Sequence, residues 1–172
     1  MSNPFPAIAR RFADCPDEVR PDGLTHAIGQ TIPFVDTAGV HIDTYTPAAV
    51  TVQLDPQHAV ANHIGTVHAA ALALLAETAS GLVTALNIPE ASVPIIRTLD
   101  VSFQRPAFEL ITATATLDAN TRERLGARPI GRVDVPVTLM VEDTAVVEAT
   151  AQWAWLPESK LNLPNTKDTR PA

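Results

Sequence analysis

The chain has 172 residues and a mass of 18.3 kDa, which suits one folded domain with a buried core and is short for two. A hydrophobic fraction of 46% excludes a disordered chain. The formal net charge is −7 and no run of Lys or Arg occurs, which counts against nucleic acid or an anionic membrane as the main partner.

The sequence also carries signals about location and metal binding. The N-terminal residues lack the uninterrupted apolar segment and cleavage pattern of a secretion signal. The longest apolar stretch, residues 67–86, is interrupted by His68, Glu77 and other polar residues, so we expect no membrane span. Cys15 is the only cysteine, which excludes an intrachain disulfide, and the histidines are too dispersed to form a ligand set. We therefore expect a cytoplasmic protein without a metal site.

The chain opens with a segment that is rich in proline. Residues 1–38 show no sustained periodicity apart from a short helical pattern at about residues 7–13, so we predict an irregular N-terminal extension. Apolar residues then alternate with polar ones in Val40–Tyr45 and again in Val50–Asp55, with the turn sequence TPAA between them. This pattern predicts a β-hairpin.

A long amphipathic helix is predicted after the hairpin. Its apolar stripe recurs at steps of three and four residues: Leu72, Leu75, Ala79, Leu82 and Leu86. A second face carries small residues that would allow a neighbouring element to approach closely: Ala70, Ala73, Ala76, Ser80 and Gly81. The helix is expected to end before Pro89, because proline disfavours the helical conformation of the residue before it.

Four further strands are predicted without another helix, at about residues 95–104, 110–117, 133–141 and 145–155. In the first, Ile95 and Leu99 are expected on one face and Thr98 on the other. Pro136 indicates a sheet edge or a bulge. Residues 157–172 are predicted to form a flexible tail. One helix can cover only one face of a sheet, so we predict an α+β fold in which an antiparallel sheet curls around the helix.

Glu77 is the one acid inside the predicted helix, and its helical neighbours are small. A carboxylate in such surroundings has a raised pKa and acts as a base toward a bound water. The alternative is that Glu77 reaches the surface or pairs with an arginine such as Arg97.

The segment before the helix gathers residues that suit an anion site. Amides at a helix start carry partial positive charge, so those near His68, Ala69 and Ala70 could bind a carbonyl oxygen that becomes negative. Gly65 would allow a tight turn, while Thr66 could cap the helix. Asn62 offers both a donor and an acceptor. The alternative is that the cluster only starts the helix.

Helical geometry limits how these groups combine. Nine residues separate His68 from Glu77. In a helix this spacing gives a rise of about 13 Å and a rotation of about half a turn. The two residues therefore cannot serve one ligand within one subunit. If they cooperate, the site lies between two chains, as in a two-fold dimer.

The pattern Asn62-x-x-Gly65-Thr66-x-His68, with Glu77 nine residues beyond the histidine, resembles the hotdog-fold acyl-CoA thioesterases of the PaaI type. The predicted strand order and the sequence Arg105–Ala107 are similar to that family as well. The resemblance covers Val40–Leu156 and implies a hotdog domain at residues 39–156. It also implies a homodimer that often pairs again into a homotetramer.

The resemblance implies roles for individual residues. Glu77 would be the general base or nucleophile, and the amide of Ala69 and its neighbour would polarise the thioester carbonyl. Asn62 would place water or substrate from the opposite subunit. The residues expected to be catalytic are Glu77, Asn62, His68 and Ala69. Those expected to bind substrate are Gly65, Thr66, Ala70 and Thr98. No cofactor is implied apart from the coenzyme A of the substrate.

Two departures from the family pattern keep other functions open. His68-Ala69-Ala70 stands where the family commonly has His-Gly-Gly, and Ile96 stands where a Ser or Thr often assists. We expect hydrolysis of an acyl-CoA thioester; a non-catalytic acyl-CoA-binding or sensor protein is the alternative. A hydratase or dehydratase of the same fold is a third alternative, but this chain does not show the arrangement of acid and histidine that such an enzyme usually has at the helix entry. The arginines of residues 121–132 could meet the phosphates of coenzyme A or face only solvent.

Overall fold

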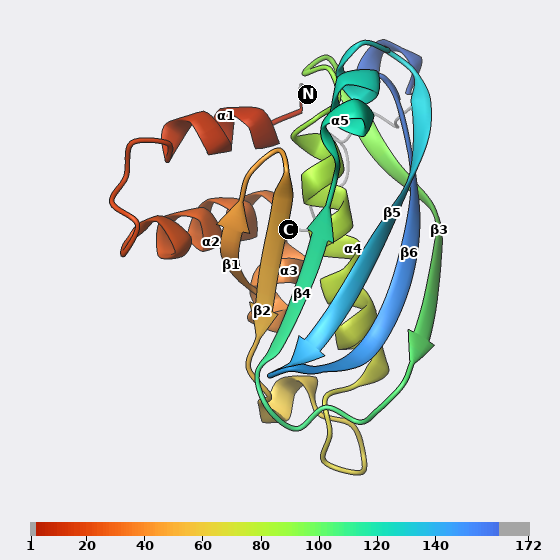
Figure 1. Cartoon of the computed structure of the whole chain (residues 1–172). Helices are drawn as coiled ribbons and strands as arrows, with labels where there is room; N and C mark the ends of the chain where they lie inside the picture. The colour runs from red at the N-terminus through yellow and green to blue at the C-terminus, as the bar shows by residue number, and fades with distance from the viewer. Residues whose placement is uncertain (1–2, 162–172) are drawn as a thin grey trace, which may run out of the picture.

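The computed structural model describes residues 3–161, which form a six-stranded antiparallel sheet with helices on one side (Figure 1). The order across the sheet is β1-β2-β4-β5-β6-β3, so the edge strands are β1 and β3. The strands are β1 (His41–Tyr45), β2 (Ala49–Leu54), β3 (Ser92–Phe103), β4 (Ile111–Thr116), β5 (Gly131–Val141) and β6 (Thr144–Pro157).

The long helix α4 (Ala69–Ala85) packs against this sheet along β2, β3, β4, β5 and β6. Its apolar stripe is fully buried at Leu75, Ala79 and Val83. Each side chain of this kind removes apolar surface from water, at about 25 cal/mol per Å² buried. The sheet therefore wraps around α4, and the predicted hotdog architecture is confirmed.

The N-terminal extension differs from the prediction, because it contains three helices and not an irregular segment with one short helix. These are α1 (Phe5–Arg11), α2 (Arg20–Thr31) and α3 (Pro33–Ala38). Each has a proline in its first turn, where the missing N–H is not needed and the fixed φ favours the helix. The prolines that suggested interruptions mark helix starts.

The extension is packed against the domain. Leu24 and Ile28 of α2 and Val35 of α3 are buried in the same core as the sheet. Thr25 Oγ1 accepts a hydrogen bond of 2.8 Å from the backbone N–H of Ile42, which ties α2 to the edge strand β1. As a result, α2 covers the edge strand β1.

A short helix, α5 (Ala119–Gly126), lies in the connection that was predicted to contain none. Asp118 caps it by accepting a hydrogen bond of 2.9 Å from the backbone N–H of Thr121, and Leu125 is buried. The signals in the sequence were the capping aspartate and the glycine at the end of the helix.

A β-bulge at Arg97 changes which residues of β3 face the helix. Ile96 pairs with Trp153, whereas Thr98 pairs with Gln152, so the pairing skips Arg97. Because this extra residue has no partner on β6, the alternation of side chains between the two faces of β3 is reversed beyond it. Ile95 therefore lies on the opposite face from Leu99, and Thr98 lies on the opposite face from Ile96. The predicted placement of Ile95 on the face of Leu99 was wrong for this reason, whereas Thr98 lies opposite Leu99 as predicted.

Smaller irregularities occur at two other strands. A register shift after Ile42 turns Tyr45, and not Thr44, toward the core. The pairing of β5 with β4 stops at Val137, so Pro136 lies at a local edge, as predicted. Most of the predicted tail, residues 162–172, lies outside the described residues. Within residues 3–161, no helix combines the length and the hydrophobicity needed to cross a membrane.

Candidate functional site

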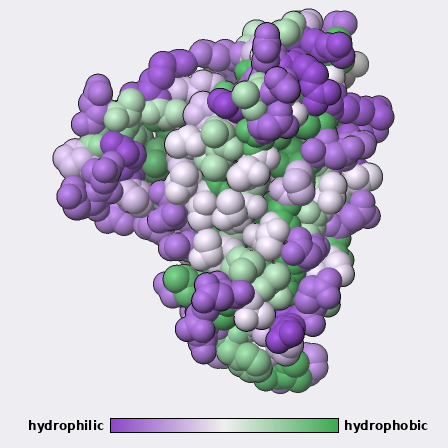
Figure 2. All heavy atoms as spheres, viewed as in Figure 1, coloured by the Kyte–Doolittle hydropathy of each residue, from purple (hydrophilic) through white to green (hydrophobic). Residues whose placement is uncertain are grey.

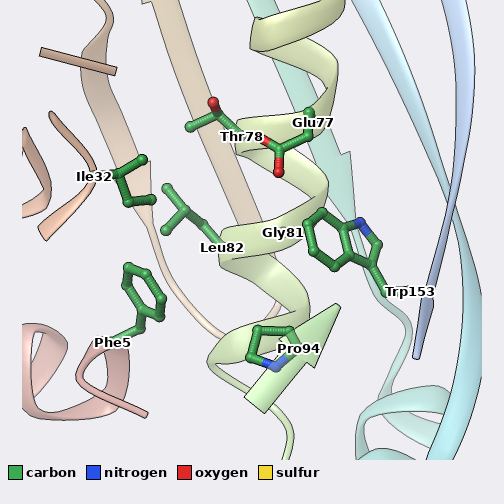
Figure 3. A pocket seen from close by; sticks show the side chains of 8 residues that line it. All are labelled: Phe5, Ile32, Glu77, Thr78, Gly81, Leu82, Pro94 and Trp153. Atoms are coloured by element: carbon green, nitrogen blue, oxygen red, sulfur yellow. The ribbon is translucent and has the colours of Figure 1, made fainter. Parts of the chain in front are cut away.

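Glu77 lies in the middle of α4 and lines a pocket of about 170 Å³ (Figure 3). Its carboxylate points into the space between Leu82 and Trp153. The walls come from three parts of the chain. The helix α4 contributes Glu77, Thr78, Gly81 and Leu82, the sheet contributes Pro94 and Trp153, and the extension contributes Phe5 and Ile32.

The surroundings of Glu77 raise the pKa of its carboxyl group above the ordinary value, because burial disfavours the charged form. Within residues 3–161, no side chain forms a hydrogen bond or an ion pair with this carboxylate. Arg97 is exposed, and the alternative in which it neutralises Glu77 is not realised. Glu77 is therefore a half-buried acid that is free to act on a bound molecule.

Trp153 forms the wall opposite the extension and is held in place by Ser80. Its indole Nε1 donates a hydrogen bond of 3.0 Å to Ser80 Oγ, which in turn donates to the carbonyl of Ala76 at 2.7 Å. A Cβ at Gly81 would lie 2.7 Å from the ring, so glycine is needed there. Trp153 is buried in the core, and its place beside Glu77 could not be predicted from the strand pattern.

The loop before α4 is organised by Asn62. Its Nδ2 donates to Thr66 Oγ1 at 2.7 Å, and its Oδ1 accepts from the backbone N–H groups of Ile64 and Thr66. Gly65 has a φ of +80°, a conformation that glycine adopts without strain. Thr66 is buried. The polar groups of Asn62 thus hold the turn that leads into the helix.

His68 caps the helix start. The prediction that Thr66 would cap it was therefore wrong. The Nδ1 atom of His68 accepts a hydrogen bond of 3.0 Å from the backbone N–H of Ala70. The histidine ring reaches this amide because it belongs to the residue directly before the first helical turn, whereas the Thr66 hydroxyl is bound by Asn62. In the part of the chain described, the Ala69 amide has no acceptor.

A second pocket, of about 240 Å³, lies at the helix start. It is lined by His68 and Ala70 together with Phe34 and Thr37 of α3. Glu77 does not line this pocket, and His68 does not line the pocket of Glu77. Within one chain the two groups of predicted residues are therefore separate, in agreement with the helical spacing.

Thr98 belongs to neither pocket. The bulge at Arg97 places it on the outer face of β3, where it is exposed. Thr98 thus lies on the opposite face of β3 from Ile96, and substrate binding by Thr98 stays a prediction. Ile96 itself faces inward and is partly buried against the core.

Comparisons with known proteins bear on the family and the fold of the chain. A family model described as a domain of unknown function, DUF4442, matches residues 22–156. A structural-genomics protein is 26% identical, with a TM-score of 0.72, over 89% of this chain and 98% of its own. A Pseudomonas aeruginosa protein of unknown function, described as a probable thioesterase, is 27% identical, with a TM-score of 0.70, over 77% of this chain and 93% of its own.

A thioesterase from Haemophilus influenzae shares the fold at 16% identity and a TM-score of 0.65, over 77% of this chain and 90% of its own. A comparison with curated proteins gives no match. The solved structures confirm the predicted resemblance to hotdog thioesterases.

Proposed function

Because this chain belongs to the family described as DUF4442 and shares its fold with thioesterases, we propose that it hydrolyses an acyl-CoA thioester to a free acid and coenzyme A. The reaction needs no cofactor beyond the coenzyme A of the substrate. The observation that carries the proposal is the half-buried carboxylate of Glu77, which has a raised pKa and opens into an apolar pocket. Such a group is suited to accept a proton from water.

The second half of the site is the helix start of another subunit. Ala70 and Ala73 lie on the side of α4 that carries Glu77, and their small side chains favour close contact between two helices. In a two-fold dimer the α4 helices would run antiparallel, which brings the start of one toward the middle of the other. The partner's Ala69 would then offer its free amide to a thioester bound beside Glu77.

The surface near the start of α4 suits self-association. Large apolar side chains are exposed in the loop before α4 and in the connection from β3 to β4: Ile64, Phe103, Phe108 and Leu110. Figure 1 shows these two segments at the bottom of the view, where Figure 2 shows hydrophobic surface. An exposed patch of this kind is typical of a protein interface. It supports a homodimer, and pairing of dimers into a tetramer is compatible with it.

The chemical steps follow from this arrangement. Glu77 takes a proton from water while the hydroxyl oxygen forms a bond to the thioester carbon. The partner's Ala69 amide donates a hydrogen bond to the carbonyl oxygen as it becomes negative. The tetrahedral intermediate then collapses, the carbon–sulfur bond breaks, and the proton held by Glu77 passes to the thiolate of coenzyme A. The acid and the thiol leave, and Glu77 is ionised again.

The test is hydrolysis of a panel of acyl-CoA thioesters by the wild type and by Glu77→Gln. We expect the substitution to lower kcat by at least about a hundredfold, because a general base contributes roughly 10²–10⁴. Glu123→Gln on α5 is the matched control, since it makes the same chemical change on the exposed surface. Equal activity of Glu77→Gln and the wild type would rule out the assigned role.

A non-catalytic acyl-CoA-binding or sensor function is the second candidate. It is favoured by the helix start, where His68 occupies the Ala70 amide and leaves only the Ala69 amide free within residues 3–161. One donor stabilises an oxyanion less than two. Tight binding of acyl-CoA without hydrolysis across the same panel would support this function.

A further inference from the structure

The pocket beside Glu77 has a wall that lies outside the unit formed by the sheet and α4. Phe5 of α1 and Ile32, at the end of α2, face Leu82 on one side of the pocket, with Pro94 and Trp153 opposite (Figure 3). The carboxylate of Glu77 lies toward one end of the pocket, and Phe5 lies toward the other. A group that reacts at Glu77 would therefore extend toward Phe5.

Phe5 is anchored on both sides by backbone contacts. The hydroxyl of Tyr45 donates to the Phe5 carbonyl at 3.2 Å, and the Oδ1 atom of Asn3 accepts from the Phe5 N–H at 3.2 Å. Asn3 is buried, and its Nδ2 donates at 2.7 Å to the carbonyl of Ala85 in the last turn of α4. The position of the Phe5 ring is thus tied to the same helix that carries Glu77.

Ile32 is held at the junction of two helices. Its N–H donates to the carbonyl of Ile28 at 2.7 Å, and its own carbonyl accepts from the N–H of Val35 at 3.0 Å. Ile28 and Val35 are buried in the core. The wall formed by Phe5 and Ile32 is therefore a fixed part of the structure and not a loose cover.

The size and the lining of the pocket define the chemistry of its occupant. Apart from Glu77 and the hydroxyl of Thr78, the lining side chains are apolar or, at Gly81, absent. The volume of about 170 Å³ is close to that of an apolar cavity of roughly 150 Å³ that holds benzene. An aromatic ring or an aliphatic chain of similar size fits, whereas a long fatty acyl chain would meet the wall.

We propose that Phe5 and Ile32 are specificity-determining residues that close the acyl pocket and restrict the enzyme to aromatic or short aliphatic acyl groups. This proposal rests on the proposed function, because it assigns the pocket to the acyl part of the thioester. It gives the N-terminal extension a role in substrate choice.

The test compares the wild type, Phe5→Ala and Ile32→Ala on acetyl-, benzoyl-, hexanoyl- and decanoyl-CoA. The wild type should prefer benzoyl- and hexanoyl-CoA. Each variant should raise kcat/KM for decanoyl-CoA relative to hexanoyl-CoA by about tenfold, the scale at which pockets discriminate between apolar groups. Phe12→Ala is the matched control, because Phe12 ends α1, lies against Gly23 of α2 and does not line this pocket.

Thermal unfolding of each variant separates a changed pocket from a damaged fold. Phe5→Leu and Ile32→Val serve if the alanine variants do not fold, with a smaller shift in the same direction expected. An unchanged chain-length profile in folded variants would overturn the proposal. If the wild type hydrolyses none of these four thioesters, the proposed function fails. The affinities of wild type and variants for the same thioesters then test the role of Phe5 and Ile32. If affinity depends on acyl chain length equally in wild type and variants, the proposal is overturned.

Discussion

At the scale of single residues, Glu77 combines two properties that a catalytic base needs. It is sufficiently buried for the pKa of its carboxyl group to be raised, and within residues 3–161 no other group engages its oxygens. The raised pKa makes the carboxylate a stronger base than that of an exposed glutamate, which titrates at about 4.3.

The raised pKa of Glu77 predicts the pH dependence of hydrolysis. Only the ionised form accepts a proton, so kcat/KM should fall as the pH drops through the raised pKa. The acid limb should therefore lie above the value of about 4.3 for an exposed glutamate. Rates measured between about pH 4 and pH 8 test this, and an acid limb at or below that value would contradict the assignment.

The raised pKa of Glu77 also predicts how the stability of the fold depends on pH, which provides an independent control. A folded-state pKa above the unfolded one means that the protonated form stabilises the fold and that this contribution is lost as the pH rises through the folded pKa. Glu77→Gln resembles the protonated form. It should raise the melting temperature at neutral pH, and the gain should disappear in acid.

At the scale of single elements, the start of α4 is arranged so that one amide remains free. His68 accepts from the N–H of Ala70, whereas Ala69 occupies the first helical position and its N–H has no acceptor within the described part of the chain. Proline is favoured at the first position of a helix and lacks this N–H. Ala69→Pro therefore removes the proposed donor with little change to the fold.

Ala69→Pro should lower kcat by about 10²–10³, the usual cost of one oxyanion donor. His68 has a φ of −65° and a ψ of 139°, which a following proline accepts, so the variant should fold. Ala119→Pro at the first position of α5 is the matched control and should keep full activity. If both proline variants hydrolyse acyl-CoA equally well, the Ala69 amide is not the donor.

Some helices and strands could be predicted from the sequence, and others could not. Hydrophobic periodicity correctly predicted α4 and the strands, because burial of one face imposes it. The extension was misinterpreted, since Pro6, Pro21 and Pro33 occupy first turns, where proline is favoured. The bulge at Arg97 depends on pairing between distant strands, which a single sequence does not display. The same holds for the contact of Phe5 with the pocket of Glu77.

At the scale of the whole molecule, the pocket of Glu77 and the pocket of His68 are separate within one chain. Under the proposed function, each pocket is half of a site, and a two-fold dimer would join it to the complementary half of its partner. Activity would then be a property of the assembly.

Mixed dimers test this arrangement directly. Glu77→Gln and Ala69→Pro should each be nearly inactive alone, but a dimer with one chain of each kind contains one site with both defects and one intact site. Random mixing after co-expression should restore about a quarter of wild-type activity, since half of the dimers are mixed and each has one working site. Activity that stays at the level of the single variants would place the whole site within one chain.

The bulge in β3 also affects how related sequences should be compared. Residues 92–96 and residues 98–103 belong to two registers that are separated only by Arg97. A relative that lacks one residue at this point would pair in one continuous register and keep Pro94 and Ile96 on the side that faces α4. An alignment that places the gap elsewhere in the strand would match inner side chains with outer ones. Alignments of this strand should therefore be fixed independently on each side of residue 97 before any residue beside Glu77 is declared equivalent.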